Sequence, residues 1–393
     1  MKIVLANNCL GRSKGGIEAW IYHAAETLLE LGHEPILVAN KNRIGENAAP
    51  KGVKIIGIKP FKHLIPLFGI LEAHFNFRTA FKKLDRELKP DAWWIRSGEM
   101  AGAIVKNVNS PIVFIHAANF PEYARMSMDG HLKGSLLQDL FSKSRRWPYL
   151  KMAYFIERRA LKYSYANVYL SNSRRQEIAN YYGDWMLKQS HVIPPGVDFK
   201  RFHPTKLKYN DNELRILSVC RLVKDKNIQQ IIKAIALLAK KGINIHYRIA
   251  GDGGYAKNLQ TLVKSLNIEN NVEFIGESKS IEEVYRWGDI FVLLSIYEGF
   301  GNVYLEAMAS GLPCLALRPK AGKYLIATDE IIEDDYTGRL LENDSPESCA
   351  MVLEQLSINR DHLKKMKKNA RTCAIEKYSW KRCITTLLKL TEN

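Results

Sequence analysis

The sequence predicts an α/β fold made of two doubly wound, Rossmann-like domains that face a central cleft. Its 393 residues suit about two domains at roughly 100 to 200 residues each. Short apolar runs alternate with helical patterns, and strands separated by helices form parallel sheets covered on both faces. This alternation starts afresh after the proline-containing segment 193–204. We therefore expect a first domain over residues 1–198 and a second over residues 199–374.

The first domain shows the pattern from its first residues. A helix is expected at 18–31, where apolar residues recur at helical spacing and the run ends at Gly32. The expected strands are 2–6, 34–39, 92–95, 112–116 and 166–171.

The second domain repeats the alternation more cleanly. The expected strands are 215–219, 245–250, 272–275, 290–294 and 313–316, and the expected helices are 228–240, 255–266, 281–286 and 303–310. A last helix is expected at 375–390, and the segment 375–393 is expected to pack back on the first domain. Ligands of doubly wound sheets bind beyond the carboxyl ends of the strands, so the strand-to-helix turns are the places to search for a site.

The charge is the unusual feature of the composition. Lys and Arg number 58 against 41 Asp and Glu, a formal charge of +17, whereas 46% hydrophobic residues is ordinary. These values exclude a disordered, collagen-like or disulfide-dense chain. The excess indicates a polyanion, an anionic membrane or a phosphorylated substrate as partner.

Other features favour a cytoplasmic protein. No apolar run approaches the ~18 residues of a membrane span, and the first residues read as a strand rather than a signal peptide. The six cysteines are scattered and form no C-x-x-C pair, so we expect free thiols in a reducing compartment and no metal cluster.

Three turns carry polar or glycine residues at expected carboxyl strand ends. Gly15-Gly16 lies between the first strand and the first helix, where glycines and free N–H groups suit an anion, although a tight turn needs glycine too. Arg221 and Lys226 follow the first strand of the second domain and can hold phosphate oxygens, or can form a solvated basic loop. Gly251-Asp252-Gly253 follows the next strand and matches neither a dinucleotide fingerprint nor a P-loop.

The most specific stretch is 295–313, in which a strand leads into a Gly-x-Gly turn, a helix and Gly-Leu-Pro. Glu298 precedes the turn, and Glu306 lies one to two turns into the helix. Each carboxylate can accept two hydroxyl hydrogen bonds, as the vicinal diols of a sugar or ribose require. The backbone N–H groups of Gly299–Asn302 can meet a phosphate at the start of the helix.

This Glu298-x7-Glu306 string resembles the signature of retaining glycosyltransferases of the GT-B fold, the large GT4 family (glycosyl transferases group 1). Further family features occur in the same order: Gly15-Gly16-x-Glu18, Ser171-Asn172-Ser173, 193–198, Arg221 with Lys226, Gly251-Asp252-Gly253, Phe274-Ile275-Gly276 and Gly311-Leu312-Pro313. The resemblance covers nearly the whole chain and is thin between about residues 41 and 165, where such enzymes carry the acceptor site.

The resemblance implies roles for the matching residues. Arg221 and Lys226 would neutralise the diphosphate of a nucleotide-sugar donor, Glu306 would hold the ribose, and Glu298 the donor sugar. His116, at the end of strand 112–116, matches a histidine near the reacting carbon, although a packed histidine is the alternative. The full donor set is Gly15, Gly16, Arg221, Lys226, Gly251, Gly253, Glu298, Gly299, Phe300, Gly301, Asn302, Val303 and Glu306.

In such enzymes the acceptor attacks the face from which the diphosphate leaves, and catalysis rests on positioning and charge stabilisation. No D-x-D motif occurs where a metal-dependent transferase needs one, so no metal and no cofactor are expected, with a UDP- or GDP-sugar as the substrate. The loop 318–324 departs from the family pattern of glycines and a glutamate, which puts sugar contacts from this loop in question.

Much of the charge excess lies in a basic patch at 133–175, where ten cationic residues face only Asp139 and Glu157. Its interpretations are a surface for an anionic bilayer, a docking site for an acidic glycan acceptor, or an ordinary exposed face. The members singled out are Lys143, Arg145, Arg146, Trp147, Lys151, Arg158 and Arg159.

The sequence thus favours a transferase that moves a sugar to a glycan or lipid-linked acceptor, in bacterial surface polysaccharide or lipopolysaccharide biosynthesis. A nucleotide-sugar epimerase of the same architecture is one alternative. A non-catalytic polyanion-binding protein is another, but no nucleic-acid motif is present, so nucleic acid is not an expected partner.

Overall fold

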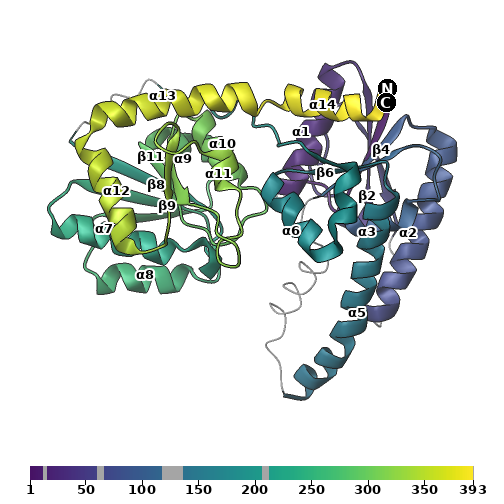
Figure 1. Cartoon of the computed structure of the whole chain (residues 1–393), viewed down its shortest axis with the longest axis horizontal. Coiled ribbons are helices and arrows are strands. Elements are labelled where there is room, and N and C mark those ends of the chain that lie inside the picture. The colour runs from purple at the N-terminus through teal and green to yellow at the C-terminus, as the bar shows by residue number, and fades with distance from the viewer. Residues whose placement is uncertain (12–15, 60–65, 117–135, 206–211, 393) are drawn as a thin grey trace. The chain divides into compact units, whose positions relative to one another are not determined.

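The computed structural model describes residues 1–11, 16–59, 66–116, 136–205 and 212–392, with backbone alone for 66–73 and 136–149. The chain divides into two compact units (Figure 1). Unit 1 comprises Met1–Pro194 together with Cys383–Asn393, and unit 2 comprises Pro195–Arg382. The first division falls between Pro194 and Pro195, slightly before the predicted boundary at 198/199.

Unit 1 is built on a seven-stranded parallel sheet in the order β3-β2-β1-β4-β5-β6-β7. The strands are β1 (Lys2–Ala6), β2 (Glu34–Asn40), β3 (Lys54–Ile58), β4 (Ala92–Ile95), β5 (Ile112–Ile115), β6 (Ala166–Tyr169) and β7 (Ser190–Val192). The five predicted strands are confirmed within two residues at each end. β3 and β7 were not predicted; both are edge strands, and only Ile58 of β3 and no residue of β7 is buried.

The helices of unit 1 cover this sheet. They are α1 (Gly16–Glu30), α2 (Pro66–Leu88), α3 (Gly98–Ile104), α5 (Leu136–Tyr163) and α6 (Asn172–Tyr182). Helix α3 packs against both α2 and α5 (Figure 1). A Cβ atom at Gly102 of α3 would lie 2.3 Å from the carbonyl oxygen of Ile156 in α5, so only glycine permits this close helix contact.

Unit 2 contains a six-stranded parallel sheet in the order β10-β9-β8-β11-β12-β13. Its strands are β8 (Leu214–Val219), β9 (Ile245–Ala250), β10 (Val272–Gly276), β11 (Ile290–Leu293), β12 (Cys314–Leu317) and β13 (Gly338–Leu341). The chain first builds outward from β8 to β10 and then returns to β11 on the other side of β8. The topological switch therefore lies between β8 and β11, the usual ligand position in such sheets.

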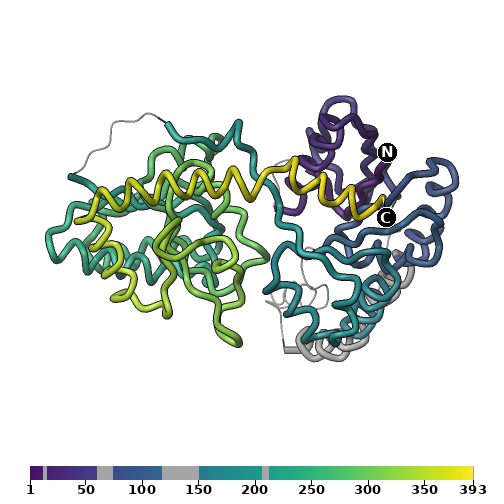
Figure 2. Tube along the Cα trace, turned by 45° about the horizontal axis from the view of Figure 1, so that its top comes forward, coloured from purple at the N-terminus to yellow at the C-terminus, as the bar shows by residue number. Residues whose placement is uncertain are grey.

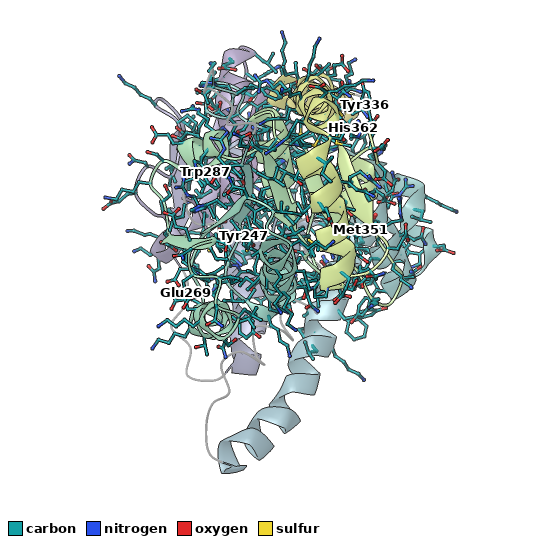
Figure 3. The ribbon with its side chains drawn as sticks, turned by 90° about the vertical axis from the view of Figure 1, so that its left-hand side faces the viewer. Tyr247, Glu269, Trp287, Tyr336, Met351 and His362 are labelled. Atoms are coloured by element: carbon teal, nitrogen blue, oxygen red, sulfur yellow. The ribbon has the colours of Figure 1, made fainter. Side chains whose placement is uncertain are left out.

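Helices surround the sheet of unit 2. They are α7 (Ile228–Lys240), α8 (Ala256–Ser265), α9 (Ile281–Trp287), α10 (Asn302–Ala309), α11 (Thr328–Ile331), α12 (Pro346–Ile358) and α13 (Arg360–Lys377). Helix α12 packs on α7, and α10 packs on α13. Tyr247 of β9 is fully buried in this unit, whereas Met351 of α12 lies on the outer surface (Figure 3).

The predicted single helix at 375–390 is wrong, because the chain breaks at Tyr378-Ser379 into α13 and α14 (Trp380–Glu392). The hydroxyl of Ser379 accepts a hydrogen bond from the backbone N–H of Arg382 at 3.1 Å, as a helix cap does. Ser379 also forms a parallel bridge with Val197. These contacts favour an extended backbone at Ser379 over a continuous helix.

Helix α14 buries Cys383, Ile384, Leu387 and Leu388, and from Cys383 onward it belongs to unit 1. The trace in Figure 2 shows this C-terminal helix beside the N-terminal part of that unit. All six cysteines are free thiols, four of them buried.

Among the helices described, none combines the length and the apolar character needed to cross a membrane.

Candidate functional site

The candidate site of unit 2 is located at the switch between β8 and β11. Lys226 ends a short 3-10 turn (Lys224–Lys226) after β8, and Glu298 follows β11. Because the two strands are parallel neighbours, their carboxyl ends lie at the same edge of the sheet. The backbone N–H of Ile296 donates to the carbonyl of Asp225 at 3.0 Å, which ties the two loops together.

Lys226 and Glu298 form an ion pair across these loops. Lys226 Nζ lies 2.6 Å from Glu298 Oε1, and the side chains are only 13% and 15% exposed. The ammonium also donates to the carbonyl of Tyr297 at 3.3 Å, and the hydroxyl of Ser295 donates to Glu298 Oε1 at 2.9 Å. The pair therefore presents a fixed cation and a fixed carboxylate side by side.

Leu325, directly after the loop 318–324 that departs from the family pattern, holds the Glu298 segment in place. The backbone N–H of Glu298 donates to the carbonyl of Leu325 at 3.1 Å, and that of Leu325 donates to Ile296 at 2.9 Å. Arg318 at the start of the loop bonds instead to Glu342 and Asp334, at 2.6 and 2.8 Å. The backbone of Leu325, rather than the loop before it, thus supports the site.

A turn with unpaired amides joins Glu298 to helix α10. Gly301 caps the helix with φ of 102°, and a Cβ atom there would lie 2.6 Å from the ring of Tyr304, so glycine is required. Within the described chain, the N–H groups of Gly299, Phe300 and Gly301 have no hydrogen-bond acceptor. Asn302 and Val303 form the first turn of α10, where N–H groups and the helix dipole favour an anion.

Glu306 lies on α10, and Tyr285 of α9 holds it. The Tyr285 hydroxyl donates to Glu306 Oε2 at 2.8 Å. Burial raises the pKa of Glu306 to about 7, although the Tyr285 hydrogen bond and the more distant Arg201 act against this rise. The carboxyl group can therefore exchange a proton near neutral pH.

Positions 251 and 253 require glycine because the backbone there packs directly against the backbone of Cys220 and Leu222. Gly251 has φ of 121°, and a Cβ atom there would lie 1.9 Å from the Cys220 carbonyl; at Gly253 it would lie 2.4 Å from the Leu222 carbonyl. Their N–H groups donate to Gly276 and to the Asp252 side chain, both at 2.7 Å. This packing fixes the loop that carries Arg221. Donor binding by the two glycines stays a prediction.

Arg221 itself is exposed, and it has no ion pair with any described residue. Its guanidinium is thus available to a ligand.

The candidates of unit 1 occupy different surroundings. Gly15 lies outside the described residues, and Gly16 is the exposed first residue of α1. His116 directly follows β5 and is 1% exposed, with Nε2 3.1 Å from Glu157 Oε1. Sequence reasoning missed Glu157 because it counted this residue as an opposing charge of the basic patch; its side chain is fully buried. Its four-residue spacing from the buried Ala153 and three-residue spacing from Ala160 were the available signals of an inward face.

The structure describes the side chains of only part of the predicted basic patch. Lys143, Arg145, Arg146 and Trp147 lie outside the residues with described side chains, and Lys151 and Arg158 are exposed. Arg159 is half-buried, and its guanidinium donates to the carbonyl of Val105 at 3.0 Å, so its place in the patch stays a prediction. Arg174 of the same segment is buried and pairs with Glu177 at 2.7 Å.

In the described ranges, no three His, Cys, Asp or Glu side chains are grouped as a metal site would require.

Comparison with protein-family models gives two matches that follow one another along the chain. Residues 14–201 match Glycosyltransferase Family 4. Residues 199–372 match Glycosyl transferases group 1. Together they support a glycosyltransferase of this group.

Two curated relatives share about a third of their aligned residues with this chain. N-acetyl-alpha-D-glucosaminyl L-malate synthase of Bacillus anthracis is 30% identical over 192 residues, 48% of each chain. Alpha-monoglucosyldiacylglycerol synthase of Streptococcus pneumoniae is 32% identical over 148 residues, 34% of each chain. The matched regions therefore span less than half of either relative.

Two solved structures share the fold over the whole chain. Anabaena Alr3699/HepE in complex with UDP and glucose has a TM-score of 0.73 at 16% identity, and WaaG, a glycosyltransferase involved in lipopolysaccharide biosynthesis, has 0.69 at 18%. Each alignment covers 100% of both chains. With its two Rossmann-like units, the chain has the GT-B fold.

Proposed function

We propose that this chain is a retaining glycosyltransferase that transfers a sugar from a nucleotide-diphosphate donor to a glycan or lipid-linked acceptor. The observation that carries the proposal is the Lys226–Glu298 pair, with Nζ and Oε1 2.6 Å apart, beside the unpaired amides of the Gly299–Gly301 turn. A sugar diphosphate needs cations and N–H donors for its phosphates and a carboxylate for its hydroxyls. The site supplies all three at one strand edge.

Each group has a role in the proposed reaction. Lys226 and Arg221 take the negative charge of the diphosphate, which grows as the bond to the sugar breaks. Glu298 accepts hydrogen bonds from sugar hydroxyls, and Glu306 from those of the ribose. The acceptor attacks from the side that the diphosphate leaves, and the departing phosphate takes its proton. Lys226 and Arg221 stabilise the charge of the leaving diphosphate in this proposal, so we propose a metal-independent reaction.

The donor and acceptor classes rest on the comparisons. The Anabaena structure holds UDP and glucose, which favours UDP over GDP as the nucleotide of the donor here. The Streptococcus relative is named as a glucosyldiacylglycerol synthase, and WaaG serves lipopolysaccharide biosynthesis. We infer a glycan or lipid-linked acceptor, in the synthesis of a bacterial surface polysaccharide or lipopolysaccharide.

Peripheral membrane contact is part of the proposal. Lys151, Phe155, Arg158 and Lys162 follow one another at spacings of four, three and four residues on α5, and all four are exposed. This spacing places them on one face of the helix. Cations interleaved with an aromatic ring suit an anionic bilayer surface.

The donor proposal is tested by ligand binding and turnover. In a thermal-shift screen of UDP-, GDP- and ADP-sugars we expect one nucleotide class to raise the melting temperature. With the matching donor and an acceptor, Lys226→Ala and Glu306→Ala should abolish transfer while the protein stays folded. Lys224→Ala, which removes a neighbouring exposed lysine, is the matched control and should keep full activity.

Undiminished turnover in either site variant would refute the assignment of these residues. Conversion of a nucleotide sugar without any acceptor would favour an epimerase instead. Retention is checked by the anomeric configuration of the product, and an inverted product would overturn it.

A further inference from the structure

We propose that Glu157 is a positioning residue for His116, and that the Tyr182 hydroxyl in turn holds Glu157. This inference rests on the proposed function, in which His116 lies near the donor sugar. The Glu157 carboxylate faces His116 with one oxygen, Oε1, 3.1 Å from Nε2. Its other oxygen, Oε2, accepts a hydrogen bond from Tyr182 at 2.5 Å. Both oxygens of the carboxylate are thus engaged.

The side chains of His116, Glu157 and Tyr182 are buried together, so the Glu157 carboxylate depends on its partners for stability. The side chains of His116 and Glu157 are 0% exposed, and Tyr182 is 5% exposed. A carboxylate removed from water is costly unless it is paired or hydrogen-bonded. The charge of Glu157 also acts on its neighbours: burial first and then this carboxylate raise the pKa of the Tyr182 hydroxyl.

Aromatic rings fix the plane of the imidazole. Tyr169 of β6 stacks on His116 with the ring centroids 5.2 Å apart and the planes at 23°. Phe114 of β5 lies 4.9 Å away on a tilted plane. The ring is therefore held by packing within its sheet, while Glu157 places a negative charge beside Nε2 from a helix.

Two glycines on α3 let helix α5, which carries Glu157, pack close to the sheet that carries His116. A Cβ atom at Gly98 would lie 3.2 Å from Glu157 Oε1, and one at Gly102 would lie 2.3 Å from the Ile156 carbonyl. Larger side chains at these two positions, one helical turn apart, would push α5 away from the sheet. The Gly98–Gly102 spacing thus explains how a carboxylate on α5 reaches the residue after β5.

A carboxylate that faces Nε2 favours a proton on that nitrogen, which leaves Nδ1 as a hydrogen-bond acceptor. Neither ring nitrogen has a hydrogen-bond partner in the described part of the chain, so the carboxylate acts on Nε2 through its charge at 3.1 Å rather than through an aligned hydrogen bond. Glu157 would act only through His116, by favouring the tautomer with the proton on Nε2.

The test uses Glu157→Gln, which keeps the shape and removes the charge. We expect kcat to fall by about 10- to 100-fold, the size of effect that orienting groups have at other sites, with donor KM within about twofold. Tyr182→Phe should give a smaller loss in the same parameter. Glu177→Gln on α6, a carboxylate that pairs with Arg174 instead, is the matched control and should leave kcat unchanged.

Two readouts separate positioning from plain structural support. In ¹⁵N-labelled protein, the imidazole of His116, assigned with His116→Gln, should show the proton on Nε2 in the wild type and a changed tautomer balance in Glu157→Gln. In a His116→Gln background, Glu157→Gln should cause no further loss of kcat. An unchanged tautomer, or a loss that is fully additive in that background, overturns the proposal.

Failure of this inference differs from failure of the proposed function. If no donor supports transfer, the proposed function fails, and the tautomer measurement alone decides whether Glu157 controls His116.

Discussion

Two carboxyl groups of unit 2, those of Glu298 and Glu306, lie in different surroundings. Glu298 accepts hydrogen bonds from the ammonium of Lys226 and the hydroxyl of Ser295. Glu306 has a neutral phenol as its hydrogen-bond partner, and burial raises its pKa to about 7. The two carboxyl groups thus have different partners, and the raised pKa of Glu306 lets that group alternate between accepting and donating a hydrogen bond.

The raised pKa of Glu306 predicts a pH-dependent cost in stability. Because the folded value of about 7 exceeds the ordinary value of 4.5, the folded protein holds this proton more tightly than the unfolded chain does. The stability that the folded protein gains from holding this proton is fully present below pH 4.5 and is lost as the pH rises through 7. The loss is at most about 3 kcal/mol. Glu306→Gln should thus be more stable than wild type at pH 8.5 and equally stable at pH 4.5.

Urea unfolding at the two pH values measures this difference. Glu269→Gln, at an exposed position on the surface of unit 2 (Figure 3), is the control and should match wild type at both. Equal stabilities of Glu306→Gln and wild type at pH 8.5 would contradict the burial cost.

At the scale of elements, local pattern and neighbouring packing each decide part of the structure. The predicted ranges of α7 and β9 agree with the structure at both ends, since each has a strong period of its own. The break between α13 and α14 and the edge strands β3 and β7 escaped prediction. Their formation depends on partners far along the sequence, such as Val197 for Ser379, rather than on the local pattern.

Backbone packing between elements predicts an asymmetry within one glycine turn. Gly251→Ala should destabilise the protein by at least about 2 kcal/mol, because the new Cβ atom meets the Cys220 carbonyl and the residue must keep a positive φ. It should also weaken donor binding by displacing the Arg221 loop. Gly254→Ala, with no atom within 4 Å of its Cβ position, should change neither quantity. Chemical denaturation and donor titration of the two variants provide the comparison.

At the scale of the whole molecule, the basic residues behind the charge excess have different roles. Lys226 and Arg221 serve the proposed diphosphate site, Arg159 and Arg174 hold unit 1 together, and the Lys151–Lys162 face of α5 remains exposed. Net charge alone therefore overstates the surface available to a polyanion. The cleft expected between the two domains stays a prediction.

The exposed face of α5 predicts charge-dependent membrane binding. In liposome flotation the protein should bind vesicles with anionic lipid and not neutral vesicles, and 0.5 M salt should release it because salt screens the attraction. Replacing Lys151, Arg158 and Lys162 by Gln should reduce binding at least several-fold, whereas the same change at Lys233, Lys240 and Lys257 of unit 2 should not. Equal partitioning onto both kinds of vesicle would remove the electrostatic explanation.

The return of the C-terminus to unit 1 predicts a selective effect of truncation. A chain that ends at Ser379 lacks the buried side chains of α14, so hydrogen exchange in β1 and β4 should accelerate while β8 and β9 stay protected. Lys381→Ala removes an exposed side chain from the same helix and should leave both sheets unchanged. Equal acceleration in both units would show that α14 supports the whole chain rather than unit 1.

The sequence by itself determined the parallel α/β architecture, because strand and helix periods are local and recur along the chain. It also identified Glu298, Glu306, Arg221 and Lys226 as candidate site residues, since their spacing from the glycine turns can be read from the sequence. Only the tertiary structure decided which groups meet. Lys226 and Glu298 are 72 residues apart and come together because β8 and β11 are neighbours. Glu157 reaches His116 because α5 packs closely on α3, a contact that no local pattern encodes.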